Sequence, residues 1–247
     1  MRSKFAPSHN PIARIAETYW EQSRQPLASL VFLAPILVVY ETGVLLFGAA
    51  NIRNGADAWL RQLLEMFGFG QYFLLPVLTV CALLAWHYLT RRPWQLSRGL
   101  MLGMTAECIA LAVGLRLILH VQGMLFAQWS GPMPLSLGPR VASAVGFLGA
   151  GVYEELLFRL LLLSPIAWGM CRVGVKPAVS YTTAVLVTSF LFALAHHVGP
   201  GGYPFVWFDF VFRFLAGVFF STLFLFRGFG IAAGSHAGYD ILVGVLP

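Results

Sequence analysis

Long apolar runs dominate the sequence and limit what the chain can fold into. A transmembrane helix needs about 20 consecutive, mostly apolar residues, and about seven stretches qualify. They cover residues 28–49, 71–89, 99–121, 141–168, 178–197, 205–226 and 229–246. The fourth stretch is long enough for a tilted or broken helix. We therefore predict an all-α, polytopic integral membrane protein, a helical bundle of about seven transmembrane helices with about six to eight as the range.

The composition agrees with this class. Hydrophobic residues make up 58% of the chain and charged residues 11%, whereas about 25% of the residues in soluble globular domains are charged. The lipid bilayer is therefore a predicted partner. The net charge of +6 does not indicate nucleic-acid binding, because the basic residues lie between the apolar runs and not in one patch.

The distribution of basic residues indicates an orientation, because cytoplasmic connections have an excess of Lys and Arg. With a cytoplasmic N-terminus, the inner side holds Arg2, Lys4, Arg14, Arg24, Arg91, Arg92, Arg98, Arg172, Lys176 and Arg227, and the outer side holds Arg53, Arg61 and Arg140. We therefore predict that the N-terminus is cytoplasmic. The same pattern, with no eukaryotic targeting signal, favours the plasma (inner) membrane of a bacterium.

The chain divides into two parts. Residues 1–27 are predicted to be a cytoplasmic or interfacial segment, either with a surface helix over about 11–25 or as a solvated tail. Residues 28–247 are predicted to form one membrane-embedded domain, in which the longest polar connections, about 50–70 and 122–140, are short loops. Nothing in the sequence specifies an oligomeric state.

Three charged residues interrupt the fourth apolar run, in the stretch GVYEELLFRL. Each ionisable residue at bilayer depth costs about 2.5–3.5 kcal/mol on insertion scales. Glu155 and Arg159 are four residues apart, so on a helix they share a face and can pair. Glu154 is rotated by about 100° from Glu155 and is left without a partner on its own helix. A salt-bridge cluster that joins helices is the alternative explanation for these charges.

Two later apolar runs contain further polar residues. FALAHH places His196 at the end of one run, and GSHAGYD places His236 and Asp240 in the last one, four residues apart and therefore on one face. Three glycines of small-xxx-small spacing lie on roughly the opposite side and allow a neighbouring helix to pack closely. They are Gly230, Gly234 and Gly238.

These residue types suit a water-activating hydrolase built inside a membrane. An unpaired glutamate in a dry site can act as a general base, and a nearby histidine can share the proton and orient a water. A second histidine with a hydrogen-bonding neighbour can donate to the oxyanion of a tetrahedral intermediate.

In this order, the residues resemble the motifs of the CAAX protease and bacteriocin-processing family of intramembrane glutamic endopeptidases, which includes the Ras-converting prenyl-protein endopeptidase. Glu154, Glu155 and Arg159 match the family's EExxxR motif, Phe192 and His196 match FxxxH, and the last motif, HxxxN or HxxxD, is matched by His236 and Asp240. The resemblance covers about residues 140–246. Each motif alone is weak, but all three in order on late apolar runs are specific.

The resemblance implies a role for each residue. Glu154 and His196 activate a water, Glu155 with Arg159 supports the site, and His236 with Asp240 forms the oxyanion pocket. The prenyl-protein proteases have Asn where this chain has Asp240. An ionised Asp cannot donate a hydrogen bond, so Asp240 either stays protonated or orients His236. The implied substrate is a membrane-anchored peptide or protein.

The sequence also bears on other mechanisms and functions. The sequence has no HExxH, no GxGD and no GxSG with a distant histidine, which argues against the zinc, aspartyl and serine classes of intramembrane protease. No cofactor is expected, although Glu154, Glu155, His196 and His236 are residue types that can hold zinc. A metal-dependent hydrolase is therefore one alternative, and a bacteriocin-immunity protein, a scaffold or a proton-coupled transporter without catalytic activity is another.

Overall fold

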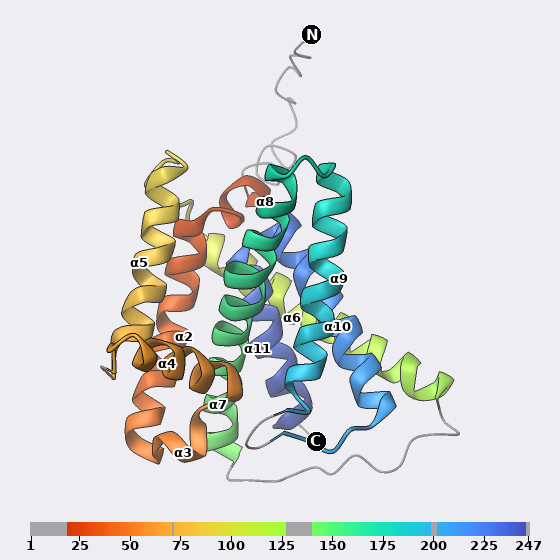
Figure 1. Cartoon of the computed structure of the whole chain (residues 1–247). Coiled ribbons are helices and arrows are strands. Elements are labelled where there is room, and N and C mark those ends of the chain that lie inside the picture. The colour runs from red at the N-terminus through yellow and green to blue at the C-terminus, as the bar shows by residue number, and fades with distance from the viewer. Residues whose placement is uncertain (1–18, 71, 127–139, 199–201, 246–247) are drawn as a thin grey trace.

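A computed structural model describes residues 19–70, 72–126, 140–198 and 202–245, and in these residues all regular structure is helical (Figure 1). The helices are α2 (Pro26–Phe47), α3 (Ala49–Ile52), α4 (Gly55–Met66), α5 (Leu74–Leu89), α6 (Leu100–Leu125), α7 (Arg140–Glu155), α8 (Ser164–Arg172), α9 (Pro177–Ala195), α10 (Trp207–Arg227) and α11 (Phe229–Gly244). A π-helical segment, Leu156–Leu163, connects α7 to α8.

Each of the seven predicted apolar runs contains a helix, which confirms the all-α membrane bundle. Five helices are long and apolar enough to cross a membrane: Pro26–Phe47, Leu100–Leu125, Val141–Arg172, Pro177–Ala195 and Trp207–Arg227. The remaining two, α5 and α11, have 16 residues each. The helix boundaries follow local chemistry. Pro26 and Pro177 lie in the first turns of α2 and α9, where no backbone N–H is needed.

Helix α11 lies at the centre of the bundle, in contact with α2, α6, α7 and α10 (Figure 1). Every residue from Phe229 to Ala237 is buried. The sharp turn that brings the chain back from α10 into α11 is made at Gly228, whose φ of 87° lies in the region that favours glycine. The first half of the last helix is therefore enclosed by the other helices.

The predicted glycine face of α11 packs as expected. A Cβ added to Gly230 would lie 2.9 Å from Ser29 Cα on α2, and one added to Gly234 would lie 2.6 Å from the Phe32 ring. These glycines allow α11 to approach α2 closely, and they turn the opposite face, with His236, toward α7 and α10.

The chain from Arg140 to Arg172 is one helical path with a π-helical segment within it. The fourth apolar run was predicted to be tilted or broken, and its regular α-helix is interrupted by the π-helical segment. Ser164 Oγ donates a hydrogen bond to the Arg159 carbonyl at 3.0 Å, inside the widened turn. Such π-helical turns are often found at functional sites.

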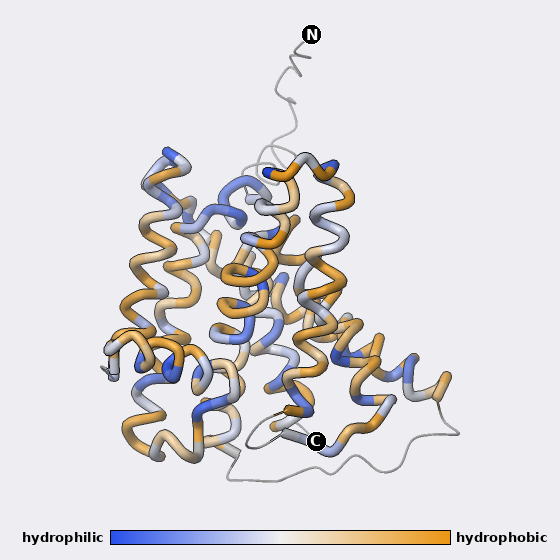
Figure 2. Tube along the Cα trace, in the orientation of Figure 1, coloured by the Kyte–Doolittle hydropathy of each residue, from blue (hydrophilic) through white to orange (hydrophobic). Residues whose placement is uncertain are grey.

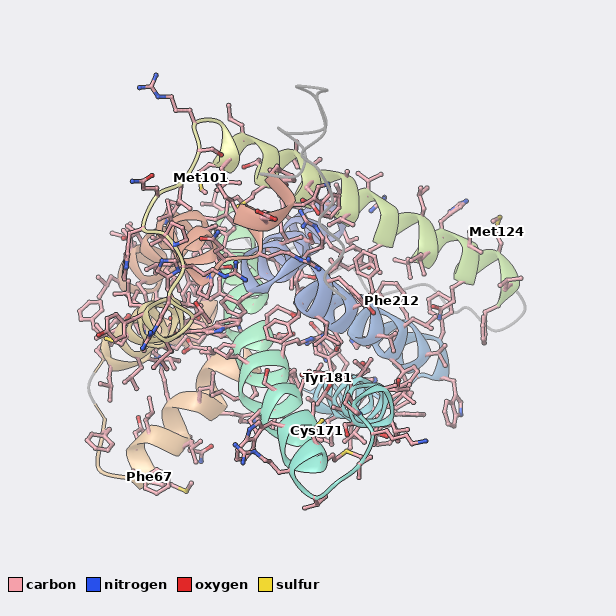
Figure 3. All side chains as sticks on the ribbon, turned by 90° about the horizontal axis from the view of Figure 1, so that it is seen from above. Phe67, Met101, Met124, Cys171, Tyr181 and Phe212 are labelled. Atoms are coloured by element: carbon pink, nitrogen blue, oxygen red, sulfur yellow. The ribbon has the colours of Figure 1, made fainter. Side chains whose placement is uncertain are left out.

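The outer surface of the bundle is apolar. Large side chains such as Val38, Leu46 and Leu102 are mostly exposed, and Figure 2 shows hydrophobic residues along most of the length of the helices. The helices differ in tilt. Viewed from above, α6 runs lengthwise across the view from Met101 to Met124, whereas α9, at Tyr181, is seen nearly end-on (Figure 3).

The prediction of a loop over about 50–70 is wrong. This stretch forms α3 and α4, and α4 lies across the direction of α2 and α5 (Figure 1). The side chain of Asn54 caps α4 by accepting a hydrogen bond from the Asp57 N–H at 2.9 Å. The mixture of charged and apolar residues made the stretch look like a solvated connection, but Asp57 and Arg61 are buried against the bundle.

Two other predicted segments fall largely outside the described residues. Of the proposed surface helix at about 11–25, the structure describes the last residues, and 19–23 are helical. Of the proposed loop at 122–140, residues 122–125 belong to α6, residue 140 begins α7, and 127–139 lie outside the described residues.

Candidate active site

A fully buried ion pair forms the base of the candidate site. Arg159 Nε lies 3.0 Å from Glu155 Oε2, and neither residue is exposed. This confirms the pairing predicted from their spacing. Arg159 Nη2 also donates to the Gly217 carbonyl of α10 at 3.1 Å. The guanidinium therefore joins the π-helical segment to α10 in addition to neutralising Glu155.

The second carboxylate oxygen of Glu155 binds the last helix. His236 Nδ1 lies 2.8 Å from Glu155 Oε1. A carboxylate only accepts hydrogen bonds, so Nδ1 of His236 has the proton and donates it. Glu155 is thus held by Arg159 and by His236 together, a contact that links residues 81 positions apart.

Glu154 faces two imidazole rings. Its Oε2 atom lies 3.8 Å from His196 Nε2 and 3.8 Å from His236 Nε2. These distances exceed those of a direct hydrogen bond. Among the described residues, Glu154 Oε2 has no hydrogen-bond partner. The structure therefore brings together Glu154, His196 and His236 from three different helical segments.

The orientation of His196 is set by its own helix. Its Nδ1 lies 2.8 Å from the Phe192 carbonyl, at the C-terminal end of α9. Because a carbonyl only accepts, Nδ1 donates and Nε2 of the neutral ring is an acceptor that points to Glu154. Tyr203 then donates its backbone N–H to the His196 carbonyl at 2.9 Å.

Asp240 lies on the same face of α11 as His236, with its Oδ2 atom 3.5 Å from His236 Nε2. About one fifth of the side chains of Asp240 and His196 is exposed, whereas the Glu155 side chain is wholly buried. Asp240 and His196 therefore lie on the more exposed side of the cluster.

Aromatic rings enclose His196 and His236, and only some of these rings were predicted from the sequence. Phe192, predicted as part of the FxxxH pattern, has its ring centroid 4.9 Å from His196 and 5.8 Å from His236. Phe220 of α10 stacks on His236 at 4.4 Å, and this contact was missed. In a Phe-rich helix, no local signal distinguishes the ring that faces the site from those that face lipid.

The other charged residues inside the spans are mostly paired, as expected for such positions. Glu107 of α6 forms an ion pair with Arg227 at 2.6 Å. Arg213 lies 3.8 Å from Asp209, one turn away on α10. In the described part of the chain, neither pair forms a hydrogen bond or an ion pair with the six predicted site residues.

The proposed zinc ligands do not form a matching set. In the part of the chain that the structure describes, no group of three or more His, Cys, Asp or Glu side chains is arranged to hold a metal ion. Both oxygens of Glu155 already face Arg159 and His236. Glu155 could act as a ligand only by giving up one of these partners.

All six predicted site residues lie in one segment of the chain, and that segment has a recognisable sequence. Residues 136–242 match the Rce1-like family, described as type II CAAX prenyl endopeptidase Rce1-like. The match confirms the family resemblance that the three motifs indicated. The Rce1-like segment extends from α7 into α11, so α2–α6 lie outside it. No curated protein matches the chain. No solved structure matches it either.

The segment 136–242 is thus similar to a family of proteases, and five of the described helices are long and apolar enough to cross a membrane. Within the Rce1-like segment, the three motifs lie on different helical elements that pack together, α7 with its π-helical extension, α9 and α11.

Proposed function

We propose that the protein is an intramembrane endopeptidase that uses Glu154 to activate water and cuts a membrane-anchored peptide or protein. The observation that supports this most directly is the position of Glu154 Oε2, 3.8 Å from the Nε2 atoms of both His196 and His236. One water between Glu154 and His196 can donate a hydrogen bond to each, because both atoms are acceptors.

In the proposed reaction, the Glu154 carboxylate takes a proton from this water while the oxygen attacks the carbonyl carbon of the scissile peptide bond. The carbonyl π bond breaks and leaves a tetrahedral oxyanion. When the intermediate collapses, the C–N bond breaks and the carboxylic acid of Glu154 returns its proton to the leaving amine. The products are a carboxylic acid and an amine, and Glu154 is regenerated.

His236 is proposed as the donor to the oxyanion. Its Nδ1 faces the Glu155 carboxylate at 2.8 Å and its Nε2 faces Asp240 at 3.5 Å. Acceptors at both ring nitrogens favour the doubly protonated imidazolium, which can donate from Nε2. In this arrangement Asp240 orients and stabilises His236 and does not itself donate to the oxyanion.

The water-activating mechanism requires no metal ion. We therefore expect a peptide cleaved in H₂¹⁸O to gain one ¹⁸O in the new carboxyl group, at a rate that a zinc chelator leaves unchanged. Mass spectrometry of the products measures the ¹⁸O content of the new carboxyl group and the cleavage rate with and without chelator. The probes are quenched-fluorescence peptides attached to liposomes by a farnesylated CAAX sequence, by an acyl chain or by an apolar helix. A rate that falls with chelator and returns with zinc would favour the metal-dependent alternative.

The orientation is also a proposal. The basic residues at one end of the described bundle lie where α2, α6 and α9 begin and where α5, α8 and α10 end (Figure 1). They are Arg24, Arg91, Arg92, Arg98, Arg172, Lys176 and Arg227. We propose that this end is cytoplasmic, in the plasma membrane of a bacterium. His196 lies at the opposite end of α9, so substrates would reach the site from the outer half of the membrane.

Labelling of single cysteines tests the orientation. In a variant without the native cysteines, Gly202→Cys is expected to react with a membrane-impermeant maleimide on intact cells, and Lys176→Cys is expected to react only after the membrane is opened. Both positions are exposed; Lys176 directly precedes α9, and Gly202 precedes Tyr203, which binds the His196 carbonyl at the other end of α9. The reverse labelling pattern would place the site on the cytoplasmic side.

A further inference from the structure

A second group of buried charges lies on the other side of α7, outside the Rce1-like segment except for one residue. Glu41 of α2 is 3.0 Å from Arg61 Nη2 of α4, and Arg61 Nε is 2.6 Å from Asp57. Tyr153 of α7 donates its hydroxyl to Glu41 at 2.7 Å, and Tyr40 donates its hydroxyl to Asp57 at 2.7 Å. We call these five residues the α2–α4–α7 network.

The network is almost completely buried. Asp57, Tyr40 and Tyr153 have no exposed surface, and Glu41 and Arg61 are less than one tenth exposed. Burial disfavours the charge on Arg61, but the carboxylates of Asp57 and Glu41 outweigh it and raise the pKa of Arg61 above its usual value. Arg61 is thus charged and holds Glu41 as an acceptor that faces Tyr153.

Tyr153 precedes Glu154, and the two side chains point to different sides of α7. The hydroxyl of Tyr153 binds Glu41, while the carboxylate of Glu154 faces the histidines. Because Glu154 Oε2 has no hydrogen bond within the described residues, its position depends on where the backbone of α7 places it. The regular helix ends directly afterwards, as the π-helical segment begins at Leu156.

Two contacts hold this turn of α7 from opposite sides. Glu155 binds His236 of α11, and Tyr153 binds Glu41 of α2. The backbone also packs tightly on both sides, since a Cβ added to Gly149 would lie 2.0 Å from the Tyr40 ring and one added to Gly151 would lie 2.6 Å from Ala237. Loss of either polar contact leaves the rotation of α7 about its axis less restricted.

We infer that Tyr153 is a positioning residue for the proposed reaction. Its hydroxyl, held by Glu41 and through it by Arg61, sets the rotation and depth of α7 so that Glu154 faces His196 and His236. This role rests on the proposed function. It also gives α4, which lies outside the family match, a function in the placement of the general base.

The bundle offers a closely matched control. Tyr40 and Tyr153 are both wholly buried, both donate to a carboxylate of the network at 2.7 Å, and their rings are 5.5 Å apart. Phenylalanine at either position keeps the ring and removes one hydroxyl. We expect Tyr153→Phe and Tyr40→Phe to lower the unfolding temperature by similar amounts, because each removes one hydrogen bond of the same kind.

Catalysis separates the two variants. On the fastest-cleaved liposome-anchored peptide, we expect Tyr153→Phe to lower kcat at least tenfold with KM within twofold of the wild type, and Tyr40→Phe to keep kcat within twofold. Wild-type kcat in Tyr153→Phe, or an equal loss in Tyr40→Phe, overturns the inference. If Glu154→Gln is inactive in the same assay, the proposed function still stands.

A second readout does not depend on any substrate. In protein labelled with ¹³C at histidine, we expect Tyr153→Phe to shift the NMR signals of His196 and His236, and Tyr40→Phe to leave both in place. Substitution of each histidine in turn assigns the signals. Unchanged His196 and His236 signals in Tyr153→Phe would show that the hydroxyl does not position this turn of α7.

Discussion

Glu154→Gln is expected to lower kcat for peptide cleavage by about 10³–10⁴-fold, with KM within a few-fold of the wild type. General-base catalysis contributes typically about 10²–10⁴-fold, and the amide cannot take a proton from water. Gln has nearly the same shape as Glu. Among the described residues, Glu154 Oε2 has no hydrogen bond to lose, so the fold should be retained.

The measurement is initial cleavage rate against peptide concentration, with purified protein in liposomes. Glu65→Gln is the control, because it makes the same chemical change at an exposed position of α4 and should keep the wild-type rate. The unfolding temperature of Glu154→Gln should match that of the wild type. Full activity in Glu154→Gln would contradict the proposed mechanism and leave Glu154 as a structural residue.

Arg159→Met is expected to have the largest effect on stability, a loss of about 3–5 kcal/mol in the free energy of unfolding. This is the usual cost of removing one partner of a buried ion pair, because the other charge remains in a dry environment. Among the described residues, Glu155 would then keep His236 as its only close partner, and the Gly217 carbonyl would lose the hydrogen bond from Arg159.

The free energy of unfolding of Arg159→Met and of the wild type is measured by unfolding in mixed detergent micelles, followed by tryptophan fluorescence. Arg213→Met is the control: its pair with Asp209 is 3.8 Å long and about one fifth exposed, and such pairs contribute about 0–1 kcal/mol. The double variant Glu155→Gln with Arg159→Met should recover part of the loss, since no lone charge stays buried. Equal stability of Arg159→Met and Arg213→Met would show that the Glu155–Arg159 pair does not stabilise the bundle.

The parts of the fold that depend on local composition were predictable. An apolar run of about 20 residues in lipid must satisfy its backbone hydrogen bonds within itself and therefore forms a helix, and all seven runs did so. The Glu155–Arg159 pair was predictable for the same reason, because residues four apart on one helix are neighbours. α4 was not, because its buried charges are stabilised by Glu41 and Tyr40 on α2.

From the sequence by itself came the seven helices, the glycine face of α11, the family resemblance of the segment 136–242 and the six candidate site residues. Only the tertiary structure decided that His236 binds Glu155, that Glu154 lies between two imidazoles, and that Tyr153 reaches Glu41. These contacts join residues about 40 to 110 positions apart. They depend on how helices rotate and pack against one another, and the periodicity of a single helix does not contain that information.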